Sequence, residues 1–155
     1  PMPLEQQRTI AGYWQDVAAT TGAEFNFDFW KLCQPRRSTY PACRAVLAAR
    51  AQGAEQVMID AIQRAYYLRA MNPSDDTTLI TLADEIGLDG QQFSQDLTSP
   101  DIQSELEAEF ALRRRLGVYS FPSLVIEYRN RLSAVAIDYR DYRPTLDAIN
   151  SVLSA

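Results

Sequence analysis

The 155-residue sequence contains no histidine and only two cysteines. Without histidine the chain lacks the commonest general base and the commonest metal ligand, so imidazole chemistry is excluded. Cys33 and Cys43 are too few for a disulfide scaffold in a chain of this length, and too few and too widely spaced for a zinc site. Their spacing also differs from the C-x-x-C redox motif. We therefore expect no metal site, and we assign no catalytic residue to this chain.

Long hydrophobic runs are absent as well, because no stretch approaches the roughly 20 apolar residues that a membrane span needs. The net charge is −5, whereas binding to nucleic acid needs a basic surface. We find no signal peptide, and we expect a cytoplasmic protein with neither a membrane nor a nucleic acid as its partner. Because the chain opens at Pro1 without an initiator methionine, we expect that an upstream segment is missing from it.

The first three quarters of the sequence read as helices, because apolar residues recur at helical spacing and cap residues precede them. One segment differs: in "FNFDFW" aromatic and polar residues alternate, which predicts a short extended piece over residues 25–30. The predicted helices span residues 4–20, 39–51, 54–71, 77–86, 90–97 and 100–116.

The last quarter changes character. "PSLVIEY" and "LSAVAIDY" are strand-like, and the short connection "RNR" predicts that they pair as an antiparallel hairpin. A closing helix is predicted from about Pro144, with Leu146, Ile149, Val152 and Leu153 buried. The chain is therefore expected to be mostly helical, with a C-terminal β-hairpin and helix.

The first strand of this hairpin is apolar at three successive positions, 124–126, which indicates that both of its faces are covered. The hairpin partner can pair with only one of its edges, and an isolated two-stranded hairpin is marginally stable. We therefore predict at least one further strand, from chain that precedes Pro1 or from another subunit, and we favour the first source.

The segment "LGVYSFPSLVIE", followed by the hairpin and the terminal helix, resembles the C-terminal half of a thioredoxin-like fold. Its G-V-x-x-x-P pattern is similar to that of the DsbA family of thiol–disulfide oxidoreductases. "YWQDVAATTGAEFNFDFWK" and "RRSTYPACRAVLAA" resemble segments of the FrnE-like bacterial branch of that family. The resemblance implies an α/β, thioredoxin-like (DsbA-like) fold with a large helical insertion. It also implies a single domain over 1–155, incomplete at its N-terminus, with the helical insertion at 1–116 and the β-β-α half at 117–155.

The resemblance carries over only some of the family's functional residues. The strand and the C-x-x-C-bearing helix with which the family begins are absent here, so the redox cysteines would lie outside this chain. The resemblance implies that Ser120, Phe121 and Pro122 bind substrate and that the bond before Pro122 is cis. Thr39 and Cys43 are implied as residues that line the site, because they match a family helix that lies near it. A redox disulfide between the two cysteines is the less favoured alternative, since cytosolic thiols stay reduced.

The expected function is thiol–disulfide exchange or disulfide isomerisation on protein or small-molecule thiols and disulfides. No bound cofactor is expected, glutathione is a potential co-substrate, and homo-oligomerisation is left open. A first alternative is a kappa-type glutathione transferase or a 2-hydroxychromene-2-carboxylate isomerase, which resemble this architecture and use a single serine. A second alternative is a non-enzymatic helical interaction module. A C-x-x-C motif ahead of Pro1 would favour the redox function, and a lone serine there would favour glutathione transfer.

Overall fold

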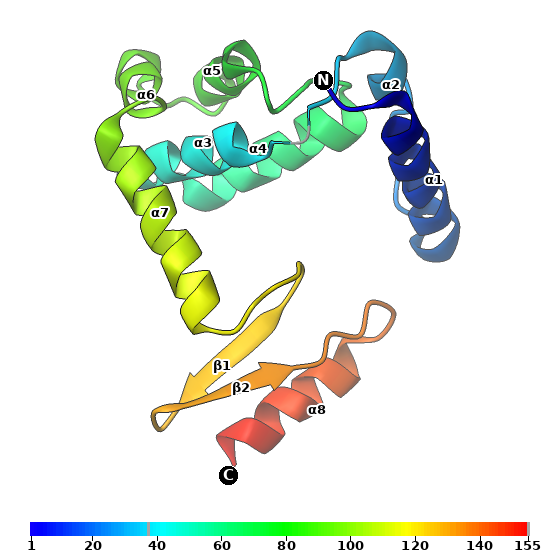
Figure 1. Ribbon diagram of the computed structural model, residues 1–155, viewed down its shortest axis with the longest axis vertical. Helices are drawn as coiled ribbons and strands as arrows, with labels where there is room; N and C mark the ends of the chain where they lie inside the picture. The colour runs from blue at the N-terminus through cyan, green and yellow to red at the C-terminus, as the bar shows by residue number, and fades with distance from the viewer. Residues whose placement is uncertain (37, 155) are drawn as a thin grey trace. The chain divides into compact units, whose positions relative to one another are not determined.

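The computed structural model describes residues 1–36 and 38–154 of the chain. It divides into two compact units, Pro1–Leu106 and Glu107–Ala155, with the boundary inside a helix. The single domain over 1–155 stays a prediction. The elements, drawn in Figure 1, are α1 (Leu4–Thr21), α2 (Phe29–Leu32), α3 (Tyr40–Ala51), α4 (Glu55–Leu68), α5 (Asp76–Glu85), α6 (Gly90–Asp96), α7 (Pro100–Arg115), β1 (Leu124–Tyr128), β2 (Arg131–Val135) and α8 (Tyr142–Leu153).

The helical unit is built around α3 and α4, which lie side by side in Figure 1 and contact each other along their lengths. Three alanines of α3, Ala45, Ala48 and Ala49, have no exposed surface and let the neighbouring helices approach closely. Larger side chains fill the space around them, and burying each one stabilises the fold by about 1.5–3 kcal/mol. The fully buried large residues of this core are Phe29, Met58, Leu79, Leu82, Phe93 and Leu97.

A cluster of aromatic side chains joins α1 to the segment before α2 and to the end of α4. Trp14 of α1 is 5% exposed and its ring contacts a set of other rings at centroid distances between 4.9 and 6.0 Å. The rings around Trp14 are those of Phe25, Phe27, Phe29, Trp30, Tyr66 and Tyr67.

The predicted extended piece at 25–30 is wrong. The Asn26 side chain accepts a hydrogen bond from the N–H of Asp28, and the N–H of Phe29 donates to the Asn26 carbonyl. These bonds turn the chain and start α2 at Phe29. The phenylalanines alternate with polar residues because their rings converge on Trp14, and not because the backbone joins a sheet.

The C-terminal unit contains an antiparallel pair of strands, with Leu124 opposite Val135 and Tyr128 opposite Arg131. Both turn residues, Arg129 and Asn130, have positive φ angles of 50° and 61°. Two positive φ angles in a two-residue turn match the right-handed twist of the strands and produce a tight hairpin. The hairpin is therefore confirmed, with β2 shorter than the predicted strand.

Helix α8 contacts both strands of the hairpin, along which it lies in Figure 1. The prediction that Leu146 and Leu153 are buried is wrong, because they are 46% and 44% exposed. A two-stranded sheet is too narrow to cover the apolar face of a helix of this length. Within the described residues β1 has no neighbour on its other edge, and the further strand expected there stays a prediction.

Candidate functional site

The segment that leads into β1 begins with a well-defined helix end. The N–H of Gly117 donates to the carbonyl of Arg114, and the N–H of Val118 donates to the carbonyl of Arg113, both at 3.1 Å. This pair of bonds, with Gly117 at a φ of 69°, is the Schellman arrangement that closes a helix on a left-handed glycine. It fixes the direction in which the chain leaves α7.

The following segment is an exposed loop around Pro122. The Phe121–Pro122 peptide bond is cis, and the side chains of Tyr119 and Phe121 are 81% and 77% exposed. The hydroxyl of Ser123 donates to the carbonyl of Ser120 at 2.6 Å, which closes the loop across the proline. The loop thus holds a defined turn although its side chains are open to solvent.

The backbone of this loop is open as well. Within residues 1–36 and 38–154, neither Tyr119 nor Phe121 makes a hydrogen bond. Their N–H and carbonyl groups can therefore bond to an extended segment from outside, as a strand adds to a sheet edge.

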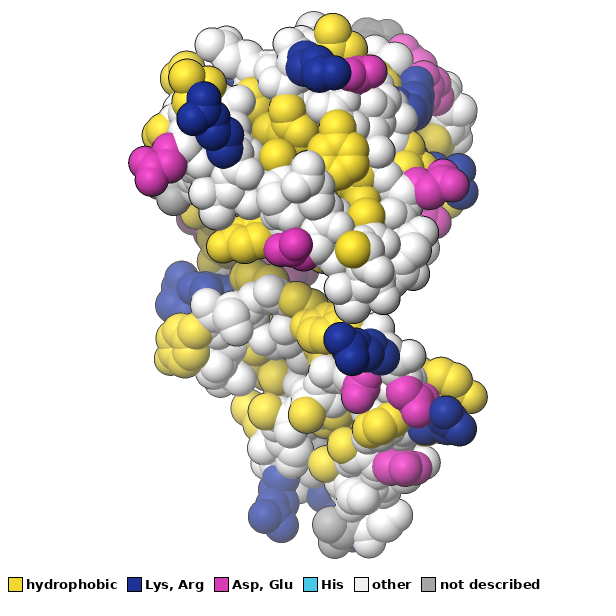
Figure 2. All heavy atoms as spheres, turned by 90° about the vertical axis from the view of Figure 1, so that its right-hand side faces the viewer, with side chains coloured by type: hydrophobic (Ala, Val, Ile, Leu, Met, Phe, Trp, Pro, Cys, Tyr) yellow, Lys and Arg dark blue, Asp and Glu magenta, His cyan; other side chains and the backbone are white. Residues whose placement is uncertain are grey.

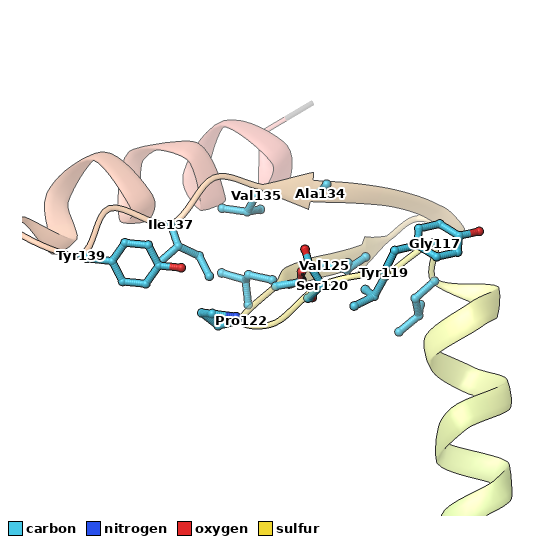
Figure 3. A pocket seen from close by; sticks show the side chains of 13 residues that line it. Gly117, Tyr119, Ser120, Pro122, Val125, Ala134, Val135, Ile137 and Tyr139 are labelled. Carbon is cyan, nitrogen blue, oxygen red and sulfur yellow. Dashed lines mark hydrogen bonds between the residues drawn. The ribbon is translucent and has the colours of Figure 1, made fainter. Parts of the chain in front are cut away.

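A cavity of about 320 Å³ lies beside the loop and the hairpin. Figure 3 shows Pro122, Ser120 and Val125 between Tyr119 toward one end and Tyr139 toward the other. The other residues that line the cavity come from the loop, from the two strands and from the segment after β2. They are Leu116, Gly117, Val118, Ser123, Leu124, Ala134, Val135 and Ile137. Such a lining of small and apolar groups can accept an apolar part of a ligand.

The far end of the cavity is held by the turn that precedes α8. The N–H groups of Arg140 and Asp141 both donate to the Asp138 carboxylate, and these bonds to Asp141 and Arg140 lower the pKa of Asp138. The N–H of Asp138 donates in turn to the hydroxyl of Thr145 at 2.9 Å. The turn therefore positions Tyr139, which is 68% exposed, at the rim of the cavity.

The structure brings Ser120 and Pro122 to the cavity, while the side chain of Phe121 is exposed outside its lining. Thr39 and Cys43 belong to the helical unit, at the start of α3, and their expected place beside the site stays a prediction. Ala134, Ile137 and Tyr139 line the cavity without having been predicted. The sequence predicts the hairpin but not which of its residues line the cavity, since only the pairing of β2 with β1 brings these three residues near Pro122.

The two thiols of the chain are free and half-buried. Burial raises the pKa of the Cys43 thiol, although a hydrogen bond with Thr39 partly opposes this. Burial, and then the Asp75 carboxylate, raise the pKa of Cys33, whose Sγ donates to the carbonyl of Ala70 at 2.9 Å. A reactive thiol needs a lowered pKa, so neither cysteine has the properties of a redox nucleophile.

We expect alkylation of Cys33 and Cys43 by iodoacetamide at pH 7.5 to be slower than alkylation of free cysteine. A raised pKa leaves less thiolate at that pH, and the rate should climb only as the pH passes above the ordinary thiol range. Mass spectrometry of the native protein against pH measures this for each site, with the urea-unfolded protein as the control. Modification of either thiol near pH 7 as fast as in the unfolded chain would contradict the expectation.

No cluster of metal-ligating side chains is found in the part of the chain that the structure describes. Among the same residues, no helix combines the length and apolar character that crossing a bilayer requires.

A helical unit ahead of a proline-containing loop, a hairpin and a terminal helix is the arrangement found in proteins with an insertion in a thioredoxin-like fold. The chain belongs to the DSBA-like thioredoxin domain family, whose family model matches residues 4–140. The family and the fold predicted from the sequence are thereby confirmed.

Solved structures agree with this assignment. A candidate protein disulfide isomerase from Nitrosomonas europaea is 26% identical, with a TM-score of 0.84 over 99% of this chain and 76% of that chain. The cytosolic disulfide reductase DsbM from Pseudomonas aeruginosa is 25% identical, with a TM-score of 0.75 over 99% of this chain and 77% of its own. The same reductase with GSH is 26% identical and matches with a TM-score of 0.67 over 90% of this chain and 71% of that one.

The chain is also similar to the ClpXP adapter protein SpxH of Bacillus subtilis, at 25% identity over 122 residues. The alignment covers 77% of this chain and 41% of the adapter. The chain therefore spans well under half the length of the curated relatives that it matches.

Proposed function

We propose that this chain forms part of a cytoplasmic thiol–disulfide oxidoreductase or disulfide isomerase whose C-x-x-C motif lies outside residues 1–155. The observation that carries the proposal is the open loop at 119–123 beside its cavity, in a chain of the DSBA-like family. The raised pKa values of Cys33 and Cys43 support a separate source of the reactive sulfur.

In the proposed reaction, a thiolate attacks one sulfur of the substrate disulfide and the other sulfur leaves as a thiolate. A second thiol then resolves the mixed disulfide, so the substrate disulfide gains two electrons and the dithiol becomes a disulfide. The residues of this chain would position the substrate: backbone groups of Phe121 would bond to it as to an added strand. The cavity beside Pro122 would accept one of its apolar groups.

The proposed substrates are protein or small-molecule thiols and disulfides, with glutathione as a co-substrate and no bound cofactor. The structure of the P. aeruginosa reductase with GSH supports glutathione as a ligand of this class. That the reductase is described as cytosolic supports the cytoplasm as the location.

Replacement of Ser123 by alanine tests the role of the loop. The change removes the 2.6 Å hydrogen bond to the Ser120 carbonyl and should loosen the turn that presents Phe121 to the substrate. We expect kcat/KM for the reduction of oxidised glutathione, or of a disulfide-bonded peptide, to fall on the order of tenfold, because small displacements of positioning groups are costly. Thiol release by the full-length protein measures this.

Ser151→Ala is the matched control, since its hydroxyl also donates to a backbone carbonyl, that of Asp147 at 2.8 Å, but within α8. An equal loss of activity in both variants would mean a general structural effect and would contradict the proposed role of the loop. The absence of any disulfide exchange by the full-length protein would overturn the proposed function itself.

A second candidate function is that of an adapter, and the match to two curated ClpXP adapter proteins favours it. In this case the protein would bind the ClpXP protease together with a substrate to be degraded. Binding of the full-length protein to purified ClpX, measured by fluorescence anisotropy, tests the proposal. Serine substitution of the C-x-x-C cysteines separates the two functions, since it should abolish disulfide exchange and leave adapter binding unchanged.

A further inference from the structure

The helical unit carries a second hollow, which the proposed redox site does not use. Its volume is about 660 Å³, and its floor is formed by the stacked rings of Trp14 and Phe25, 5.2 Å apart. Tyr13 and Val17 of α1 border it on one side, and Tyr67 and Leu68 of α4 border it on the other. We call this hollow the α1–α4 groove.

The rim of the α1–α4 groove exposes several apolar side chains. Tyr13 is 61% exposed, Val17 44%, Leu68 41% and Tyr67 36%. Figure 2 views the protein from the α1 side, and hydrophobic side chains are visible there between acidic and basic ones. Single exposed apolar residues are normal, but a group of them around a hollow marks an interaction surface.

Two charged residues of opposite sign also line the groove, Glu24 in the loop after α1 and Arg64 on α4. In the described part of the chain neither side chain makes an ion pair or a hydrogen bond. A partner that covers the groove would remove both charges from water, which is costly unless it supplies an opposite charge to each. The occupant therefore needs apolar groups together with one cation and one anion.

We propose that the occupant is a second copy of this chain, docked about a two-fold axis through the α1–α4 groove. In such an isologous dimer every contact between two different residues occurs twice, and the proposed arrangement pairs Arg64 of each copy with Glu24 of the other. The same copy supplies the apolar groups, because the exposed Tyr13 side chain at the rim is free to enter the opposite hollow. This inference is independent of the proposed redox and adapter functions.

Charge reversal gives a specific test in the full-length protein, with sedimentation velocity as the measurement. The unmodified protein should dimerise. Arg64→Glu and Glu24→Arg should each raise the dimer dissociation constant on the order of 100-fold or more, because each places like charges together twice. An equimolar mixture of the two variants should dimerise again, since every contact between positions 64 and 24 then joins one acidic and one basic side chain.

Arg8→Glu is the matched control, because Arg8 lies on α1 but does not line the groove, and it should leave the dimer intact. Circular dichroism of each variant shows that the fold is retained. A monomer at every concentration would overturn the proposal, and so would a dimer that survives both reversals. Failure of the mixture to re-form a dimer would also overturn it and would indicate a different partner. Disulfide exchange by the monomeric variants reports separately on the proposed function.

Discussion

Replacing Trp14 with alanine is expected to lower the free energy of unfolding of the helical unit by about 3–5 kcal/mol, the range for large aromatic residues in a core. Trp14 is 5% exposed and lies at the centre of the aromatic cluster. Its removal leaves the rings of Phe25 and Tyr66 without a packing partner on one side. Urea denaturation, followed by circular dichroism, measures the change.

Gln15→Ala is the control for the Trp14 variant, because Gln15 is exposed on the same helix and its replacement should change stability by only about 0.5 kcal/mol or less. Trp14→Phe should lie between the two, since it keeps an aromatic ring in the cluster. If Trp14→Ala unfolds at the same urea concentration as Gln15→Ala, the cluster does not stabilise the unit in the way argued above.

Replacing Ala134 with phenylalanine is expected to have the largest effect on the proposed activity. Ala134 is exposed, pairs with Val125 and lines the cavity beside Pro122. A phenyl ring there would fill much of the cavity of about 320 Å³ without disturbing a buried core. We expect kcat/KM for a disulfide substrate of the full-length protein to fall on the order of 100-fold, because the substrate could no longer reach its productive position.

Glu127→Phe is the matched control for Ala134→Phe. Glu127 lies on the same strand pair, opposite Leu132, is exposed and does not line the cavity. It should leave kcat/KM close to that of the unmodified protein. Full activity of the Ala134→Phe variant would show that the substrate does not use this cavity, even if the protein exchanges disulfides.

Much of the fold could be predicted because the relevant signals are local. Helix α7, for example, begins at Pro100 as predicted, with its acidic residues ahead of three arginines, and it ends at a glycine with positive φ. The hairpin follows from two strand-like runs and a short connection. Apolar spacing, helix caps and turns depend on residues only a few positions apart, so they can be predicted from the amino-acid sequence alone.

The candidate site was predicted only in part. Ser120 and Pro122 belong to one short motif, whereas Ala134 and Tyr139 reach the cavity only because β2 folds back on β1. No spacing in the sequence indicates that Ala134 and Tyr139 lie beside Pro122. Their positions depend on the register of the two strands and on the turn before α8, which hydrogen bonds to Asp138 stabilise.

Apart from α2 and the segment before it, the sequence by itself determined the order of helices and strands. It also determined the loop at Pro122 and the absence of imidazole or C-x-x-C chemistry within these residues. The tertiary structure alone decided where the phenylalanines of "FNFDFW" go, which faces of α4 and α8 stay exposed, and which side chains line each hollow. The physical reason is that burial is shared among distant segments. The ring of Trp14 on α1 contacts rings of α2 and α4, whereas within the described residues the sheet that α8 contacts has only two strands.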